Sequence, residues 1–186
     1  MPSLALKKAA SNPSAMQRIQ GFAPIEDKNA KVLILGSMPG QASLAAGQYY
    51  AHRQNTFWRI ISELLHVDAA APYEVKAEAL KSAKIALWDV LKSCMREGSL
   101  DAMIARDTHI INDFQAFLHT HQKITHIFFN GAKAEEYFMR HVLKNINHNA
   151  ISFRRLPSTS PAHASMSFAQ KLAAWRAIIA PAVVAS

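Results

Sequence analysis

Three stretches of this sequence combine a permissive backbone with polar side chains, and each follows a short apolar run. They are Gly36-Ser37-Met38-Pro39-Gly40, Asn130-Gly131 and Pro157-Ser158-Thr159-Ser160-Pro161. Glycine lets the backbone approach a ligand closely, while amide and hydroxyl groups donate and accept hydrogen bonds. If the apolar runs are neighbouring parallel strands, these loops open at one edge of a sheet, where α/β proteins bind ligands. The sequence therefore predicts a binding site at that edge.

The familiar catalytic and cofactor motifs are absent from the sequence. The turn at 36–40 lacks the lysine of a P-loop and does not match the dinucleotide fingerprint. Neither Gly-X-Ser-X-Gly nor His-Glu-X-X-His occurs. Cys94 is the only cysteine, which excludes an internal disulfide and any cysteine-based zinc or iron–sulfur site. We expect no metal and no cofactor.

Strand and helix patterns alternate along the chain. Apolar runs predict strands over 31–35, 85–90, 124–129 and 151–156, and periodic apolar residues predict helices over 56–65, 73–83, 132–143 and 168–179. Helical spacing also begins at Ile110, whereas 36–55 reads as a long loop and the stretch around Cys94 and Arg96 as irregular. Strands that alternate with helices form parallel sheets through right-handed crossovers. We expect an α/β fold, a three-layer α/β/α sandwich with a four-stranded, mostly parallel central sheet.

Length and composition indicate a single globular domain. The chain has 186 residues, of which 50% are hydrophobic and 18% charged. We place the domain at 29–186, after an irregular N-terminal arm at 1–28 that could hold a short helix. No apolar run approaches the ~18 residues that a membrane-spanning helix needs, and no apolar segment follows Lys7 and Lys8. We expect a monomer in the cytoplasm with no membrane contact.

The net charge of +8 favours an acidic partner such as nucleic acid. The basic residues are scattered, however, and form no basic tail. Charge alone therefore favours a nucleic-acid partner only modestly, because in many proteins a positive net charge serves solubility alone.

The residues around the first turn resemble a known family. The matching segments are Gly36-Ser37-Met38-Pro39-Gly40, Tyr49-Tyr50-Ala51-His52 and Asn55-Thr56-Phe57-Trp58. They resemble the first motif of the uracil-DNA glycosylase superfamily, whose mismatch-specific branch carries Gly-Ile-Asn-Pro-Gly at this turn. Ser37-Met38 replaces Ile-Asn here, so the usual catalytic asparagine is missing. This departure resembles the hypoxanthine-DNA glycosylase branch, as do Leu87-Trp88-Asp89-Val90, Phe129-Asn130-Gly131 and the segment 156–161.

The resemblance implies hydrolysis of the N-glycosidic bond of a flipped, deaminated base, which leaves an abasic site and needs no metal. It assigns Asn55 as the catalytic residue that orients the attacking water, although the residues alone favour a helix N-cap. It also assigns Asn130 as a residue that reads the base and has a possible catalytic part. The alternative for Asn130 is an ordinary Asn-Gly turn.

The resemblance places further residues around the base and the DNA. Gly36, Ser37, Met38 and Pro39 would form the pocket wall, and Tyr50 would stack on the flipped base, unless it is an anchoring aromatic. The loop Pro157-Ser158-Thr159-Ser160-Pro161 would grip phosphates, with Arg53 and His163 as further DNA contacts. Leu156 replaces the superfamily's usual histidine, which argues against strong uracil activity.

We therefore expect a DNA repair glycosylase that excises hypoxanthine from DNA. It would be monofunctional, because no motif places a lysine as an imine-forming nucleophile. A uracil or mismatch-specific glycosylase and an inactive nucleic-acid-binding member of the fold remain alternatives. A nucleoside hydrolase is a further alternative, but the aspartate cluster that such enzymes use for calcium is not found.

Overall fold

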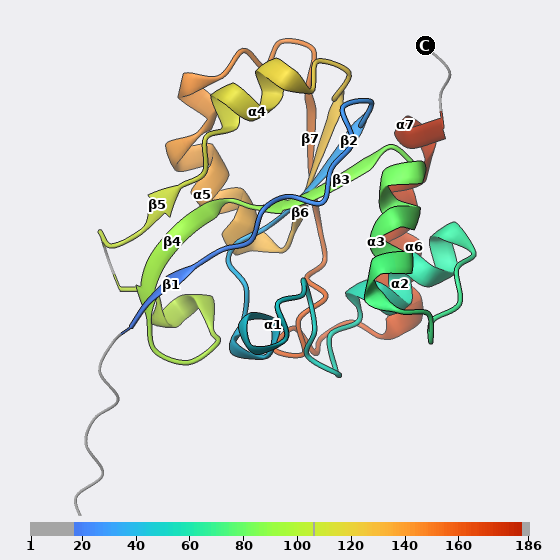
Figure 1. Ribbon diagram of the computed structural model, residues 1–186, viewed down its shortest axis with the longest axis horizontal. Coiled ribbons are helices and arrows are strands. Elements are labelled where there is room, and N and C mark those ends of the chain that lie inside the picture. Colours follow the sequence, from blue (N-terminus) through green and yellow to red (C-terminus); the bar gives the residue numbers. More distant parts are fainter. Residues whose placement is uncertain (1–16, 106, 184–186) are drawn as a thin grey trace, which may run out of the picture.

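The computed structural model describes residues 17–105 and 107–183. Its centre is a sheet of four parallel strands in the order β3-β2-β6-β7 (Figure 1). The strands are β2 (Val32–Gly36), β3 (Ile85–Asp89), β6 (His126–Asn130) and β7 (Ser152–Leu156). The four strands expected from the apolar runs are confirmed to within two residues. Because they are parallel, all four end at the same edge of the sheet.

Helices cover both faces of this sheet, which confirms the three-layer α/β/α sandwich (Figure 1). One face carries α2 (Phe57–Leu65), α3 (Tyr73–Ser82) and α6 (Phe168–Trp175), which continues into η3 (Arg176–Ile178) and α7 (Ile179–Val183). The other face carries α4 (Phe114–Thr120) and α5 (Ala132–His141), followed by η2 (Leu143–Asn145). In the described part of the chain, no helix is long and apolar enough to cross a bilayer.

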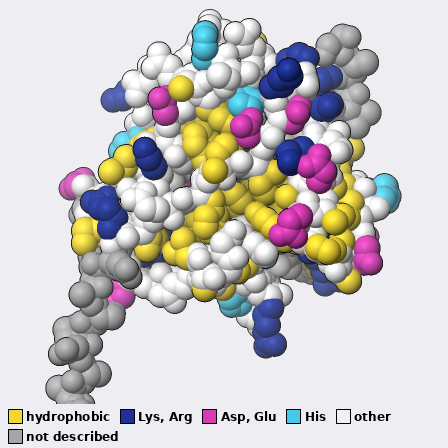
Figure 2. Space-filling model, in the orientation of Figure 1, with side chains coloured by type: hydrophobic (Ala, Val, Ile, Leu, Met, Phe, Trp, Pro, Cys, Tyr) yellow, Lys and Arg dark blue, Asp and Glu magenta, His cyan; other side chains and the backbone are white. Residues whose placement is uncertain are grey.

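One face of the molecule mixes charges of both signs. On the face drawn in Figure 2, Lys and Arg side chains stand among Asp and Glu, and hydrophobic side chains gather across its middle. This face therefore offers no continuous basic band.

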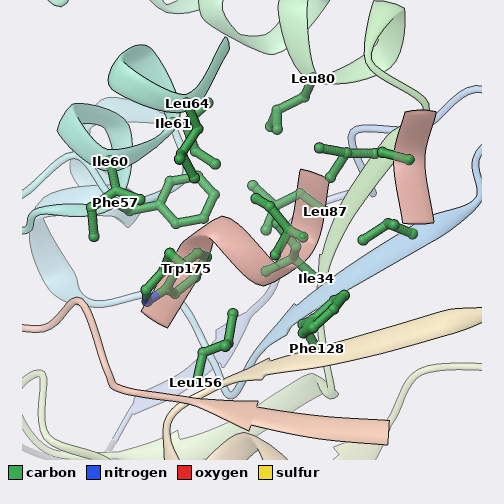
Figure 3. Packing of buried hydrophobic residues seen from close by; sticks show 14 of the residues in the cluster. Ile34, Phe57, Ile60, Ile61, Leu64, Leu80, Leu87, Phe128, Leu156 and Trp175 are labelled. Carbon is green, nitrogen blue, oxygen red and sulfur yellow. The ribbon is translucent and has the colours of Figure 1, made fainter. Parts of the chain in front are cut away.

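The core follows from the alternation of side chains along each strand. In β2, Val32 and Ile34 face the layer of α2, α3 and α6, whereas Leu33 and Leu35 face α4 and α5. Figure 3 shows the first of these cores, where side chains of α2 meet Trp175 and the strand residue Ile34. Leu156 lies in the same core and is only 2% exposed. The side chain at the end of β7 thus points into the core.

A second, antiparallel sheet was not expected from the sequence. It has the order β1-β4-β5, with β1 (Gln17–Gln20), β4 (Leu91–Arg96) and β5 (Ile110–Ile111). The prediction of an irregular stretch after residue 90 is wrong, as is the helical start at Ile110. The backbone N–H groups of Val90 and Leu91 donate to the carbonyls of Gly36 and Ser37 at 2.9 and 3.0 Å. Because of these bonds, the chain stays extended after β3 and continues directly into β4.

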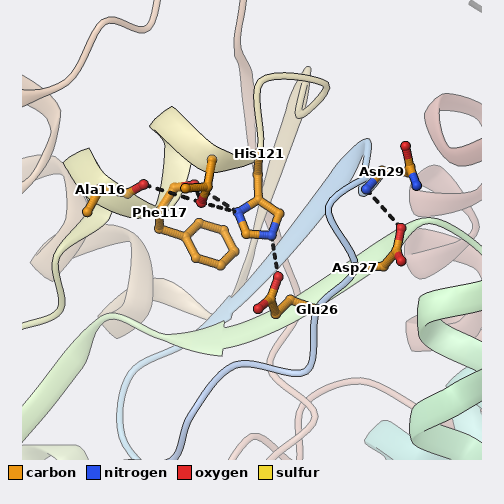
Figure 4. Close-up of polar contacts among 7 residues, drawn as sticks. Glu26, Asp27, Asn29, Ala116, Phe117 and His121 are labelled. Atoms are coloured by element: carbon orange, nitrogen blue, oxygen red, sulfur yellow. Dashed lines mark hydrogen bonds and ion pairs between the residues drawn. The ribbon is translucent and has the colours of Figure 1, made fainter.

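The described part of the expected N-terminal arm is also ordered. Residues 17–20 form β1, and residues 1–16 lie outside the described residues, so the short helix expected within 1–28 stays a prediction. Ile25 pairs with Leu87 through backbone bonds of 2.9 and 2.8 Å. Figure 4 shows Glu26 bonded to Nε2 of His121, whose Nδ1 lies 2.8 Å from the Phe117 carbonyl oxygen at the end of α4. Residues 21–26 therefore pack on the domain.

The long loop expected at 36–55 contains one short helix. This helix is α1 (Gln41–Ala46), and it ends at Gly47, whose φ of 64° is left-handed. Another single turn, η1 (Asp101–Met103), interrupts the connection between β4 and β5. Both short elements lie beside the edge at which the parallel strands end (Figure 1).

Candidate active site

A pocket of about 270 Å³ opens where the parallel strands end. Its lining joins segments that are far apart in the sequence: the turn 36–41, the segment 49–55, the ends of β3 and β6, and the loop 158–162. Most of the predicted site residues lie together here, namely Gly36, Ser37, Met38, Pro39, Tyr50, Asn55, Asn130, Ser158, Thr159, Ser160 and Pro161. Arg53, Pro157 and His163 are not among the lining residues. The convergence of loops at one edge of the sheet is therefore observed.

Gly36 is needed at the pocket floor because two polar groups crowd against it. A Cβ atom at this position would lie 2.3 Å from Oδ1 of Asp89 and 2.7 Å from the hydroxyl of Tyr50. Asp89 ends β3 directly beside Gly36 and is only 3% exposed. The carboxyl group and the phenol therefore meet at this glycine.

Tyr50 is held by aromatic packing in an unusual backbone conformation. Its φ is 53°, which a non-glycine residue rarely adopts and which often marks a functional position. Its ring lies 4.1 Å from that of Phe57, centroid to centroid, with a 30° tilt. Phe57 is fully buried, so it provides a fixed support for the Tyr50 ring.

The neighbouring Tyr49 is an anchor. Its hydroxyl donates to the carbonyl of Ala23 at 3.1 Å, and its own carbonyl accepts from Nε1 of Trp58 at 2.6 Å. Burial, and then the nearby carboxylate of Asp89, hold the pKa of Tyr49 far above its usual range. Tyr49 therefore stays protonated at any ordinary pH and acts as a structural donor.

Asn55 stands at the entrance to helix α2. Its Oδ1 accepts the backbone N–H of Phe57 at 2.9 Å, and its own N–H donates to the His52 carbonyl at 2.8 Å. The residue precedes the N-cap, Thr56, so Asn55 does help to begin the helix. This bond fixes the direction of the amide and leaves a second lone pair on Oδ1 and both hydrogens on Nδ2. The capping and catalytic interpretations of Asn55 are therefore compatible.

The side-chain amide of Asn130 is paired with a single residue. Its Nδ2 donates to Oγ1 of Thr159 at 2.9 Å, and its Oδ1 accepts the Thr159 N–H at 2.9 Å. Both bonds go to Thr159, so they occupy the edge where the amide oxygen and N–H lie side by side. Asn130 keeps the second hydrogen on Nδ2 and the second lone pair on Oδ1 for a base, and its role in reading the base stays a prediction.

Thr159 connects three parts of the site. Besides its bonds to Asn130, its carbonyl accepts the N–H and the hydroxyl of Thr56 at 3.1 and 3.3 Å. Its exposed fraction is 0%, so the phosphate contact predicted for it is not available in this conformation. Thr159 instead fixes the end of β6 relative to Thr56, which follows Asn55 and begins α2.

Replacing Thr159 with valine is expected to destabilise the protein by about 1–3 kcal/mol, because the fully buried hydroxyl that accepts from Nδ2 of Asn130 is lost. Urea unfolding measures this change in the free energy of unfolding. Thr125→Val, at an exposed threonine whose hydroxyl lies 2.9 Å from Nδ1 of the neighbouring His126, is the matched control and is expected to stay within about 0.5 kcal/mol. Equal stability of the two variants would contradict the connecting role of Thr159.

The loop after β7 presents hydroxyl groups at the rim of the pocket. Oγ of Ser158 accepts the N–H of Ser160 at 3.2 Å, and Oγ of Ser160 accepts that of Ala162 at 3.3 Å. A hydroxyl that accepts in this way keeps its own proton for donation. The loop itself is tied to α6, because the Pro157 carbonyl accepts from Nε1 of Trp175 at 2.9 Å.

The basic residues expected near DNA differ in placement. Arg53 is exposed beside the segment that carries Asn55, and His163 is partly exposed. Nζ of Lys171, a buried lysine, donates to the His163 carbonyl at 2.7 Å, and burial lowers the pKa of this lysine. Lys171 thus anchors the loop from beneath.

Several lining residues were missed from the sequence. They are Gln41, Ala42, Ser43, His52, Ser99, Leu100 and Ala162. Asp89 also lines the pocket, and its position at the end of a parallel strand was the signal that could have identified it. Arg96, which is 3% exposed, donates to the Pro39 carbonyl and thereby ties β4 to the turn. Among residues 17–105 and 107–183, no three metal-binding side chains come together.

The fold and the pocket define a three-layer α/β protein whose site is built from amides, hydroxyls and one buried carboxyl group. The family model of the uracil DNA glycosylase superfamily matches residues 23–179, and the chain belongs to this superfamily.

Relatives and solved structures agree with this membership. The chain is 41% identical over 119 residues to the hypoxanthine DNA glycosylase of Methanosarcina barkeri and 40% identical to that of Methanosarcina acetivorans, in both cases over 63% of this chain and 74% of the relative. A solution NMR structure of a candidate uracil DNA glycosylase from Methanosarcina acetivorans superposes with a TM-score of 0.73 at 35% identity. The superposition covers 88% of this chain and 97% of the chain in the NMR structure.

Proposed function

We propose that this chain is a monofunctional DNA glycosylase that flips hypoxanthine out of DNA and hydrolyses its N-glycosidic bond. The observation that carries the proposal is the position of Asn55, whose amide lines a pocket for a single base while its direction is fixed by the Phe57 N–H. Two relatives named as hypoxanthine DNA glycosylases support the choice of base.

Tyr50 provides the surface on which the flipped base stacks. One face of its ring packs on Phe57, and the residue lines the pocket. Stacking of a base on an aromatic ring contributes roughly 1–3 kcal/mol and depends little on which base is bound. Tyr50 therefore supplies affinity, and the discrimination between bases must come from polar groups.

Asp89 is suited to distinguish a deaminated base from its parent. Deamination turns the ring nitrogen N1 of adenine from an acceptor into the N1–H donor of hypoxanthine. An ionised carboxyl group only accepts hydrogen bonds, so it can bind hypoxanthine there and repels the lone pair of adenine. Asp89 lies at the pocket floor beside Gly36, where such a contact could form.

Asn55 orients the attacking water. As the bond between C1′ and the base nitrogen breaks, the sugar becomes cationic and the base leaves with the electron pair. A water that donates to the free lone pair of Oδ1 of Asn55 is held for attack on C1′, and a neutral amide suffices because the cationic sugar needs no strong base. No lysine is among the described residues that line the pocket, which supports hydrolysis without an imine.

Leu156 and Met38 support hypoxanthine over uracil. Leu156 stands where the superfamily's usual histidine would be, and its side chain is buried in the core away from the pocket. Met38 packs on Leu91 and Cys94 at the turn where the mismatch-specific branch carries asparagine. No imidazole at the former position is then available to a uracil carbonyl, and no amide at the latter can take the usual catalytic part.

The DNA backbone would lie across the rim of the pocket. Ser158 and Ser160 keep hydroxyl protons to donate to phosphate oxygens, Pro157 and Pro161 shape the loop, and Arg53 is an exposed cation nearby. His163 can join this surface from the same loop. A monomer and a cytoplasmic location stay predictions.

Replacing Tyr50 with leucine is expected to weaken binding to a duplex with a flippable base by roughly 10–100-fold, since stacking is lost. The measurement is the Kd for a duplex that carries an uncleavable deoxyinosine analogue. Tyr50→Phe, which keeps the ring, should retain most of the affinity. If leucine and phenylalanine gave the same Kd, the ring would not be the stacking surface.

The experiment that tests the function uses matched duplexes. Duplexes that carry a single deoxyinosine, deoxyuridine, deoxyxanthosine or deoxyadenosine are incubated with the protein and then treated with alkali, which breaks the strand at abasic sites. We expect breaks at deoxyinosine, few at deoxyuridine and none at deoxyadenosine. Breaks only at deoxyuridine would favour the uracil alternative, and no breaks at all would favour an inactive DNA-binding member.

A further inference from the structure

Ser43 places a buried hydroxyl group in the wall of the pocket. It belongs to helix α1, is 5% exposed and lines the pocket. The other serines among the lining residues are all at least partly exposed, namely Ser37, Ser99, Ser158 and Ser160. A hydrogen bond from a donor that is shielded from water is stronger than one at the surface. Ser43 is therefore the lining serine best suited to bind a base.

The position of the Ser43 hydroxyl is fixed by the segment that carries Tyr50. Its Oγ accepts the N–H of Ala51, the residue after Tyr50, at 3.2 Å. The Ser43 carbonyl accepts the N–H of Gln48 at 3.1 Å, which holds the end of α1 against the same segment. The hydroxyl is therefore tied to the residues that present the proposed stacking ring.

The proton of this hydroxyl is not used within the described part of the chain. A helical serine commonly donates to the carbonyl four residues before it, but that carbonyl, of Pro39, accepts from Arg96. No acceptor for the Ser43 proton is found among residues 17–105 and 107–183. A buried donor without a partner costs free energy, so the pocket favours a ligand that brings an acceptor.

The proposed substrate has an acceptor for which no donor has yet been assigned. Deamination of adenine changes N1, and it also replaces the amino group at C6 with the carbonyl oxygen O6. The carboxylate of Asp89 can accept from N1–H, but it cannot donate to O6 while it is ionised. The hydroxyl of Ser43 has the proton that O6 requires.

We propose that Ser43 is a catalytic residue that donates a hydrogen bond to O6 of the flipped base. This rests on the proposed function, because it assigns a role in the same excision reaction. When the bond between C1′ and N9 breaks, its electron pair goes to the base and the water oxygen bonds to C1′. The proton that the water loses then neutralises the base. Part of the negative charge reaches O6 as the base leaves, so the bond from Ser43 becomes stronger in the transition state and lowers the barrier.

Two substrates separate this contact from a structural role of Ser43. Single-turnover excision is measured on a deoxyinosine duplex and on the same duplex with sulfur in place of O6, because sulfur accepts hydrogen bonds only weakly. We expect Ser43→Ala to slow excision from the deoxyinosine duplex by roughly 10²-fold but excision of the sulfur analogue far less, since both changes remove the same bond. Ser43→Cys, which keeps the volume and has a weak donor, should show the same pattern.

Ser62→Ala is the matched control. Ser62 is a buried serine of α2, 3% exposed, whose hydroxyl has no partner within the described residues and which does not line the pocket. This variant should excise both bases at the normal rate. Loss of the bond between Ser43 and Ala51 would displace the segment of Tyr50 whichever base is bound, so equal slowing on both substrates by Ser43→Ala would overturn the proposal.

A second readout does not depend on excision. Infrared difference spectra are recorded with a duplex that carries an uncleavable deoxyinosine analogue labelled with ¹³C at C6. We expect the stretch of the labelled carbonyl to move to lower wavenumber when the unaltered protein binds, and to move less with Ser43→Ala. Equal shifts with the two proteins, or no shift with either, would overturn the contact. If the unaltered protein excised nothing, the proposed function would fail, while the carbonyl stretch would still decide for or against Ser43.

Discussion

Excision of hypoxanthine by the Asn55→Ala variant is expected to be slower than by the unaltered protein by about 10²-fold or more, because the attacking water loses the group that orients it. The amide of Asn55 is fixed by the N–H of Phe57 at 2.9 Å, so its free lone pair points in one direction. Single-turnover kinetics on a deoxyinosine duplex measure the chemical step without product release.

The same substitution removes a helix-starting bond, so stability must be separated from chemistry. We expect Asn55→Ala to lower the free energy of unfolding by about 1 kcal/mol. Asn55→Asp keeps an oxygen for both the Phe57 N–H and the water, and it should be more active than the alanine variant. Asn145→Ala, at an exposed asparagine in η2, is the matched control and should keep the full rate. A full rate for Asn55→Ala would remove Asn55 from the mechanism.

Gly36→Ala is expected to reduce excision by a similar factor, about 10²-fold, because a misplacement of about 1 Å in a site can cost that much. The added methyl group would lie 2.3 Å from Oδ1 of Asp89 and 2.7 Å from the Tyr50 hydroxyl. Both groups must move, and the group that accepts from the base and the ring that stacks on it move together.

The control for Gly36→Ala is another glycine whose loss is costly elsewhere. Gly47→Ala meets no atom within 4 Å, but its φ of 64° disfavours alanine, so it should cost about 1–2 kcal/mol of stability with no loss of rate. The rates and the urea unfolding of both variants are compared. If Gly36→Ala excised hypoxanthine at the normal rate, Asp89 and Tyr50 would not form the base-binding floor.

The sequence predicted the central sheet and its functional edge well, for a physical reason. Buried parallel strands are short apolar runs, and 31–35, 85–90, 124–129 and 151–156 are such runs. The glycine and asparagine residues that end them mark the edge. The motifs at 36–40, 55–58 and 129–131 thus pointed to Gly36, Asn55 and Asn130, which line one pocket.

The second sheet could not be predicted in the same way. In β4, Ser93 and Arg96 are buried while Lys92 is exposed, so the strand shows no clear apolar face. Its identity as a strand depends on pairing with β1 and on the bonds from Val90 and Leu91 to the turn at Gly36. These partners are distant in the sequence, so the hydrophobic periodicity of residues 91–96 cannot predict the pairing.

The role of Thr159 was hidden for a related reason. In a loop of serine, threonine and proline, every hydroxyl looks equally suited to bind phosphate. Only the structure shows that Thr159 is fully buried against Asn130 and Thr56, whereas Ser158 and Ser160 lie at the rim.

The central claim is that the protein releases an intact base from DNA by breaking the glycosidic bond. The most direct test is mass spectrometry of the products from a duplex with a single deoxyinosine, before any alkali treatment. We predict free hypoxanthine in an amount equal to the abasic sites formed, with the strand still uncut. A cut strand that retains deoxyinosine, or no free hypoxanthine at all, would contradict the account.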